Sequence, residues 1–212
     1  SAKISSAWVQ NSSNNTAYAI DLDENILQFA KKECLNSLGE DEFNRIKLIK
    51  GNSQTKQTPK VDCVSAFNFS YWVFHNRKDL VKYFKNSYKN LKPKGLLMLD
   101  AFGGYEAHQE LEEKTKYKDF TYCWDQHSFN PITNYITCHI HFEFNDGSVI
   151  KKAFEYNWRL WSLPEIKECL TEAGFKSIDI YMQRWDYKNN QETEKFYRMT
   201  KCDADPGWIA YI

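Results

Sequence analysis

The sequence of 212 residues is poor in the features that mark secreted and membrane-spanning proteins. Its six cysteines include no C-x-x-C pair, and Cys34, Cys63 and Cys169 fall in apolar stretches where cysteine acts as a small hydrophobe. We therefore expect reduced thiols and a cytoplasmic protein. A signal peptide and a long apolar run are both missing, so we expect no membrane-spanning segment.

A surplus of charge is also missing, because 28 Lys and Arg residues balance 28 Asp and Glu residues. Proteins that bind a phosphate backbone usually carry a basic surplus or a basic stripe. The most basic stretch, residues 82–94, alternates lysines with apolar residues at helical spacing, which favours the solvated face of a helix. We therefore expect a small-molecule partner and no nucleic acid; the oligomeric state is left open.

Familiar catalytic motifs are missing too, since the sequence has no G-x-S-x-G, no H-E-x-x-H and no P-loop. Of the five histidines, His139 and His141 would share one face of a strand, but no third ligand stands at an identifiable spacing. We therefore predict no metal site. Aromatic residues, by contrast, make up 16% of the chain, which favours a pocket lined with rings as well as an aromatic core.

The hydrophobic pattern predicts an α/β fold with a doubly wound, mostly parallel Rossmann-like sheet. An apolar helical face runs from Asp23, a suitable N-cap, to Gly39, where the helix is expected to end. The runs 61–70 and 95–102 are almost continuously apolar, which is typical of strands buried on both faces. The other elements expected in the first half are a helix at 3–10, strands at 16–21 and 45–51, and a helix at 78–91.

The pattern changes to antiparallel strands in the second half of the chain. Extended stretches are predicted at 117–129, 134–144 and 148–161, with "NDG" as a hairpin turn between the last two. We interpret residues 116–161 as a cap inserted into a core made of residues 1–115 and 162–212. After the cap we expect a helix at 162–175, a strand at 176–185, a polar and mobile stretch at 187–206, and a last strand at 207–212.

Polar residues stand at the carboxyl ends of four predicted strands: Asp21, Asn52, Asn68 and Asp100. Open parallel sheets bind their ligands at these ends. Asp23 already suits the helix cap, so Asp21 is expected either to bind the two hydroxyls of a ribose or to be a turn acid. Asn52 suits either an adenine amino group or a turn after Gly51.

Two aromatic stretches have a structural and a functional interpretation. The stretch "AFNFSYWVFHN" (66–76) is expected either to lie under a cofactor or to pack the core. Arg159, between Trp158 and Trp161, is expected either to bind a substrate carboxylate or to stack on the rings.

In their order and spacing, "YAIDLDENIL", "IKGNS", "VDCVSAFNFS", "LKPKGLLMLDAF", "WSLPEIKECLTEAGF" and "GWIAYI" resemble a class I S-adenosylmethionine-dependent methyltransferase. The resemblance covers most of the chain and implies a sheet whose last strand is antiparallel. The first strand and the Gly-rich loop of that family are not in this sequence, and "KISSAWV" resembles the helix that follows the loop. We therefore expect that the loop precedes Ser1.

The resemblance implies S-adenosylmethionine as cofactor and S-adenosylhomocysteine as product. The implied cofactor-binding residues are Asp21, Leu22, Asn52, Ser53, Asn68 and Phe69. In-line methyl transfer needs alignment rather than a covalent nucleophile, so a general base such as His75 is optional. The expected substrate contacts, beneath a closing cap, are Tyr71, Trp72, Tyr105, Trp124 and Arg159.

Two alternatives stay open. An NAD-dependent oxidoreductase would also place an acid after its second strand. A non-catalytic methyltransferase-like module that binds partners would keep the fold without the activity.

Overall fold

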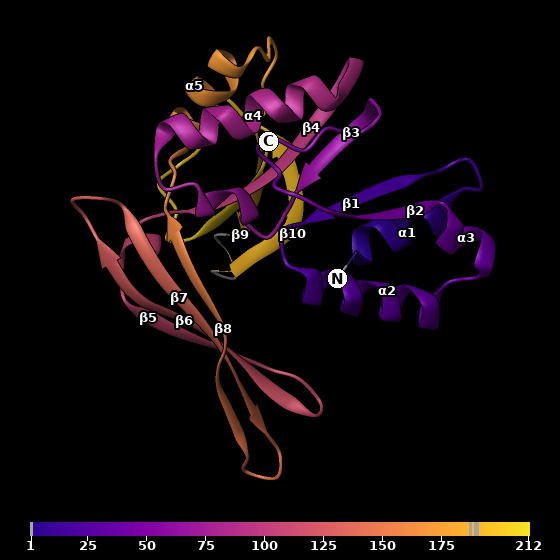
Figure 1. Ribbon diagram of the computed structural model, residues 1–212. Coiled ribbons are helices and arrows are strands. Elements are labelled where there is room, and N and C mark those ends of the chain that lie inside the picture. Colours follow the sequence, from indigo (N-terminus) through magenta and orange to yellow (C-terminus); the bar gives the residue numbers. More distant parts are fainter. Residues whose placement is uncertain (1, 187, 189–190) are drawn as a thin grey trace.

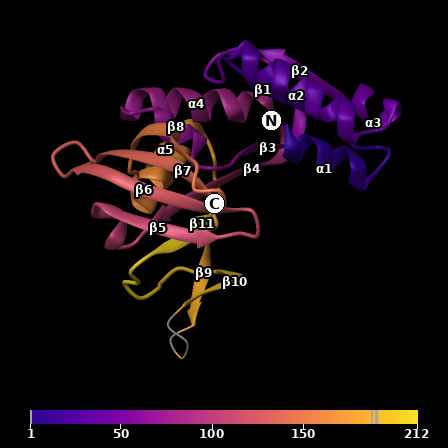
Figure 2. The same cartoon turned by 90° about the horizontal axis from the view of Figure 1, so that it is seen from below.

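The structure, a computed structural model, describes residues 2–186, 188 and 191–212, apart from the side chains of Trp185, Gln191 and Glu192 (Figure 1). Its elements fall into an N-terminal lobe, a central five-stranded sheet and a four-stranded sheet formed by residues 111–159, which we call the cap sheet. The cap sheet and the N-terminal lobe lie at opposite ends of the molecule (Figure 2).

The N-terminal lobe packs three helices against a two-stranded parallel sheet. Its elements are α1 (Lys3–Asn11), β1 (Ala17–Asp21), α2 (Glu24–Ser37), α3 (Glu40–Asn44) and β2 (Ile46–Lys50). A small separate core forms where Val9, Cys34 and Ile46 are buried together. The α2 cap is as predicted, because the Asp23 carboxylate accepts the N–H of Asn25 at 2.8 Å.

Gly39 does not end α2 as predicted. The helix ends at Ser37, with Leu38 as its C-cap, and Gly39 begins the short helix α3. The physical reason is that Gly39 has an ordinary extended backbone (φ −68°) rather than a left-handed one, and its N–H donates to the Glu42 carboxylate at 3.0 Å. Glycine here begins a helix instead of closing one.

The central sheet has the strand order β10-β9-β11-β4-β3. Strand β3 (Val61–Ala66) is parallel to β4 (Leu91–Gly103), and β11 (Trp208–Tyr211) is antiparallel to β4. The parallel pairs and the antiparallel last strand confirm the predicted fold class. In the described part of the chain β1 pairs only with β2 and β3 only with β4, so the parallel strands form two sheets, each with an open edge.

One face of β4 is covered and the other is not. Leu97, Leu99 and Ala101 pack under α4 (Arg77–Asn90) and α5 (Leu163–Ala173), whereas Leu96 and Met98 are 63% and 42% exposed. The expectation that this stretch is buried on both faces is therefore wrong for its first half. Alternation of side chains along a strand explains the difference, because helices cover only one face at this point.

The cap sheet has four antiparallel strands in the order β5-β6-β7-β8. Three of them, β6 (Phe120–Asn130), β7 (Tyr135–Phe144) and β8 (Val149–Arg159), match the predicted strands, and Gly147 has the positive φ (85°) of a tight turn. The first strand, β5 (Leu111–Lys116), is not predicted, because its charged sequence "LEEKTK" lacks an apolar alternation. Of the two short helices, η1 (Ser70–Val73) contacts β8 and α4, and η2 (Glu106–His108) contacts β4.

The end of the chain is more regular than its sequence indicates. Helix α5 begins at the predicted cap Ser162 and ends at Gly174 (φ 111°). Strand β9 (Tyr181–Asp186) begins later than predicted, and β10 (Gln191–Arg198) forms inside the stretch predicted to be mobile, so that prediction is wrong for β10. Residues 187 and 189–190 of that stretch lie outside the described part. Among the described residues, none of the helices is both long and apolar enough to cross a membrane.

Candidate functional site

Asp21 ends β1 at the carboxyl edge of the N-terminal sheet. One of its carboxylate oxygens, Oδ1, accepts the N–H of Asp23 at 3.0 Å, and its backbone carbonyl accepts the N–H of Gly51 at 2.9 Å. A carboxylate offers about four acceptor positions, so this turn leaves room for the two hydroxyls of a ribose. Leu22, the next residue, is 67% exposed at the same edge.

Asn52 follows β2 and forms a turn. Its side-chain oxygen accepts the N–H of Gln54 at 2.8 Å, and the carbonyl of Ser53 accepts a hydrogen bond from the Asn86 amide of α4 at 2.8 Å. The turn interpretation of Asn52 is thus observed. The role in adenine binding stays a prediction, because the amide group of Asn52 still carries donors beside the bonded oxygen.

The loop after β3 is held by a carboxylate from the neighbouring strand. Asp100 of β4 accepts the N–H of Asn68 at 2.7 Å and the N–H of Phe69 at 2.9 Å, one on each oxygen. Both loop residues have left-handed backbones (φ 55° and 54°), which a phenylalanine rarely adopts. Burial raises the pKa of Asp100, and the two N–H bonds oppose that rise. Asp100 therefore fixes an otherwise unfavourable loop at the carboxyl end of β3.

Phe69 leads into an aromatic cluster that joins the central sheet to the cap sheet. Its ring lies 4.8 Å from that of Phe102 and 5.9 Å from that of Trp158, and Trp124 lies 6.2 Å from Phe102. Beside this cluster is a hollow of about 290 Å³, whose walls include Phe69, Phe102, Tyr122, Trp124, Gln126 and Trp208. The predicted cofactor residue Phe69 and the predicted substrate residue Trp124 thus line one space.

The remaining predicted substrate residues do not line this hollow. Tyr71 and Trp72 are almost fully buried, and the Tyr71 hydroxyl donates to the backbone carbonyl of Asp100 at 2.7 Å. Burial raises the pKa of Tyr71 far above its ordinary range. Tyr105 is 54% exposed before η2. These placements favour packing roles for Tyr71 and Trp72.

The side chains of Arg159 and His75 are engaged in contacts within the protein and do not line the hollow. Arg159 donates to the carbonyl of His75 at 3.2 Å and to Glu165 at 2.8 Å, and its guanidinium lies 3.9 Å from the centre of the Trp161 ring. His75 Nε2 lies 2.8 Å from the carbonyl oxygen of Asn157. The stacked interpretation of Arg159 is therefore the one observed, and His75 connects the η1 loop to β8.

The structure thus brings only some of the predicted site residues together. Asp21 and Asn52 lie in the N-terminal lobe, while Phe69 and Trp124 lie at the junction of the central and cap sheets. Phe102 and Trp208 line the hollow but were not predicted, although Phe102 lies directly after the strand-end segment "LLMLDA". That position, two residues beyond Asp100, is the signal that would have indicated it.

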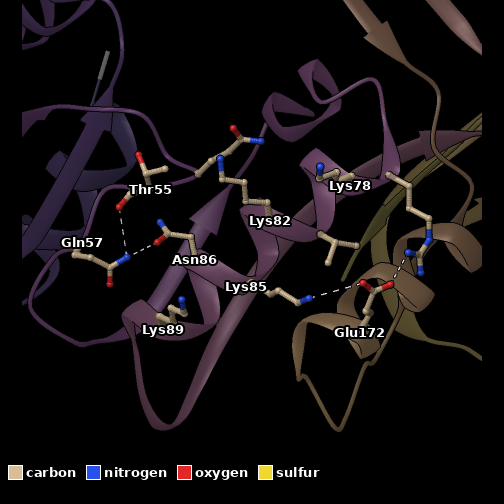
Figure 3. Close-up of a pocket in the computed structure, with 11 residues that line it drawn as sticks. Thr55, Gln57, Lys78, Lys82, Lys85, Asn86, Lys89 and Glu172 are labelled. Atoms are coloured by element: carbon tan, nitrogen blue, oxygen red, sulfur yellow. Dashed lines mark hydrogen bonds and ion pairs between the residues drawn. The ribbon is translucent and has the colours of Figure 1, made fainter.

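A second and larger hollow, of about 810 Å³, lies on the outer side of α4 (Figure 3). Its walls carry Lys78, Lys82, Lys85 and Lys89, together with Glu172 from α5, which binds Lys85 at 3.8 Å. On the opposite wall, Gln57 is hydrogen-bonded to Asn86. None of the predicted site residues is among those that line it. The lysines are exposed, as predicted for a solvated helix face.

Comparisons with known proteins agree with the fold class. Residues 2–99 match a family model described as "Methyltransferase domain". A curated relative, the "Putative methyltransferase YqeM" of Bacillus subtilis (strain 168), is 20% identical over 185 residues, which cover 84% of this chain and 72% of the relative.

Solved structures share the fold. An S-adenosylmethionine-dependent methyltransferase from Clostridium acetobutylicum ATCC 824 superposes with a TM-score of 0.63 at 19% identity, covering 93% of this chain and 74% of that one. The glycopeptide N-methyltransferase MtfA, solved with S-adenosylhomocysteine, superposes with a TM-score of 0.54 at 15% identity over 92% of this chain and 70% of its own.

Proposed function

We propose that this chain, whose residues 2–99 match a methyltransferase-domain model and whose fold is shared by solved methyltransferases, is a class I S-adenosylmethionine-dependent methyltransferase. We propose further that it methylates a small molecule held between the carboxyl ends of β3 and β4 and the cap sheet. The observation that carries the proposal is the aromatic hollow beside Phe69, Phe102 and Trp124. Its size suits part of a small acceptor rather than a polymer, and flat ring faces suit a sugar or an apolar ring.

The residues present fit the cofactor by their chemistry. Asp21 retains acceptor positions for the ribose hydroxyls, and the Asn52 amide retains donors for adenine. The Asn68–Phe69 loop, with Leu22 and Ser53 on the neighbouring turns, completes the proposed binding set. When bound, S-adenosylmethionine supplies an electrophilic methyl group on a sulfonium.

The protein's own part in the reaction is to bind, align and exclude water. In-line displacement gains most of its rate from holding the acceptor atom at the methyl carbon, so no covalent nucleophile is needed. The cap sheet contributes Trp124 and Tyr122 to the wall of the hollow and shields that side from solvent. The similarity to a glycopeptide N-methyltransferase supports a small-molecule acceptor.

Cofactor binding is tested by calorimetric titration of S-adenosylhomocysteine, with NAD as the competing candidate. We expect micromolar affinity for S-adenosylhomocysteine, none for NAD, and loss of binding in Asp21→Ala. Asp23→Ala is the matched control, because it removes a helix cap worth about 1 kcal/mol of stability and leaves the proposed ribose acceptor in place. Binding of NAD instead, or equal affinity in both variants, would contradict the proposed site.

The acceptor is tested by transfer of a labelled methyl group to a panel of amino sugars, glycopeptides and aromatic amines. We expect Trp124→Ala to lower kcat/KM at least about tenfold, since it removes one wall of the hollow. Phe154→Ala is the matched control on the same sheet, because Phe154 is 53% exposed and does not line the hollow. If S-adenosylhomocysteine binds but labelled methyl goes only to protein or nucleic acid, the small-molecule proposal is wrong.

A further inference from the structure

A cluster of histidines and acids lies on the outer face of the cap sheet. His139 Nδ1 lies 3.1 Å from Asp125 Oδ2, and His141 Nε2 lies 3.3 Å from the same oxygen. The three ligand atoms of Asp125, His139 and His141 are all within 4.8 Å of one another. Asp125 is a third candidate ligand beside the two histidines. Sequence spacing did not reveal it, because it reaches them from the neighbouring strand β6.

Two of the three distances between these ligand atoms are close to those in a tetrahedral metal site, and the third is at most 4.8 Å. Zinc binds histidine nitrogen and carboxylate oxygen at about 2.0–2.2 Å, so two ligand atoms on one tetrahedron lie roughly 3.3–3.5 Å apart. The observed 3.1 and 3.3 Å are close to that edge length. His127 Nδ1, 3.7 Å from Asp125 Oδ2, stands near enough to supply a fourth ligand in place of water.

His139 shows why the site favours an ion. Its ring is 1% exposed, and each of its nitrogens faces a carboxylate: Nδ1 faces Asp125, and Nε2 faces Glu155 at 3.2 Å. Nδ1 therefore faces the same Asp125 oxygen as His141, and Nε2 is left to an outer carboxylate. With a metal on Nδ1, the Nε2–H donates to Glu155, which is the usual outer support of a metal-binding histidine.

His141 has one competing contact. Its Nδ1 accepts the N–H of Lys152 at 2.7 Å, and Lys152 has a left-handed backbone (φ 51°) at an irregularity between β7 and β8. This contact occupies Nδ1, so coordination is through Nε2, the nitrogen that faces Asp125 Oδ2.

We propose that Asp125, His139 and His141 bind one zinc ion that ties β6 to β7 and, through Glu155, to β8. Asp125 follows Trp124 directly on β6, and successive side chains of a strand point to opposite faces. The ion therefore lies on the far side of the cap sheet from the aromatic hollow and has a structural role. It stiffens the wall that carries Trp124 without touching the proposed acceptor.

The test is a titration of tag-free protein, freed of metal by a chelator, with Co²⁺ as a spectroscopic probe and Zn²⁺ as competitor. We expect one equivalent of Co²⁺ at micromolar concentration, the visible absorption of a tetrahedral site, displacement by Zn²⁺, and a thermal unfolding temperature that rises with Zn²⁺. His141→Gln should abolish the absorption band. Glu155→Gln, at a half-exposed position, should weaken binding about 10- to 100-fold.

The control is His108→Gln, because His108 is an exposed histidine on η2, outside the cluster, and this variant should bind like the parent. Circular dichroism shows whether each variant is folded. The proposal is overturned if the folded parent protein takes up no stoichiometric Co²⁺ or Zn²⁺. It is equally overturned if His141→Gln and Glu155→Gln both retain the parent affinity, since the ion would then be bound elsewhere.

Discussion

The Asp100 carboxylate offers the sharpest test of how the strand-end loop is held. Asp100→Asn keeps the size of the side chain but replaces one acceptor oxygen by an amide donor. The two N–H groups of Asn68 and Phe69 then face one acceptor and one donor. One of these backbone N–H groups is then left without an acceptor in a buried place, because the side chain at position 100 is only 7% exposed.

The magnitude follows from the contacts. A buried donor without a partner costs about 1–3 kcal/mol, and the remaining bond loses its charge assistance, which is worth about another 1 kcal/mol. The loss of unfolding free energy should therefore be about 2–4 kcal/mol. For a chain of this length that is a fall in unfolding temperature of roughly 4–16 °C. Affinity for S-adenosylhomocysteine should also fall, because the positive φ of Phe69 is no longer enforced.

The assay is urea unfolding followed by intrinsic fluorescence, with Asp62→Asn as the matched control. Asp62 lies on the neighbouring strand, but its side chain is 84% exposed and, in the described part of the chain, pairs with Lys92 at the surface. Its replacement should change stability by no more than about 0.5 kcal/mol. If Asp100→Asn is as stable as Asp62→Asn and binds S-adenosylhomocysteine like the parent, then the carboxylate does not hold the loop.

Three further predictions concern other parts of the chain. Arg45→Ala should destabilise the N-terminal lobe by about 2 kcal/mol, because Arg45 Nη1 lies 2.7–2.9 Å from the carbonyls of Val9, Ser12 and Asn15; urea unfolding of the variant measures the loss. Burial raises the pKa of Tyr83 to about 12, so its phenol stabilises the fold below pH 10 and this contribution, roughly 2–3 kcal/mol, is lost as the pH rises to 12. Unfolding against pH should therefore be less steep in Tyr83→Phe. Fluorescence anisotropy with labelled RNA and DNA at physiological salt should show no saturable binding, despite the lysines of α4.

The predictions that depend on residues close in sequence are confirmed for the helix caps and the turn at Gly147. The caps of α2 and α5 and the glycine after α5 depend on residues two to four positions apart, and their hydrogen bonds form as the local pattern indicates. The hairpin at Gly147 is of the same kind. Gly39 is the exception, because a glycine between two helices suits the end of the first and the beginning of the second equally well.

Relations between distant segments were not available from periodicity. The exposure of Leu96 and Met98 depends on which helices cover β4, and the position of β5 depends on its pairing with β6. A continuous apolar run fits a strand buried on both faces, but it also fits one whose second face is left open. The sequence pattern of "LLML" does not distinguish these cases.

The residues of the candidate site also divide into those that local sequence indicates and those that depend on distant contacts. Asp21 is predicted as a ribose ligand because its neighbour Asp23 already serves as the cap, which is a local argument. The conformation of Phe69 opposes its own backbone preference and exists because Asp100, 31 residues later, accepts its N–H. A positive φ at a phenylalanine beside an aromatic hollow is a place where tertiary contacts override local preference, and such places are where functional geometry is usually found. Asp100 therefore belongs with the site residues even though it does not line the hollow, because it decides where Phe69 stands.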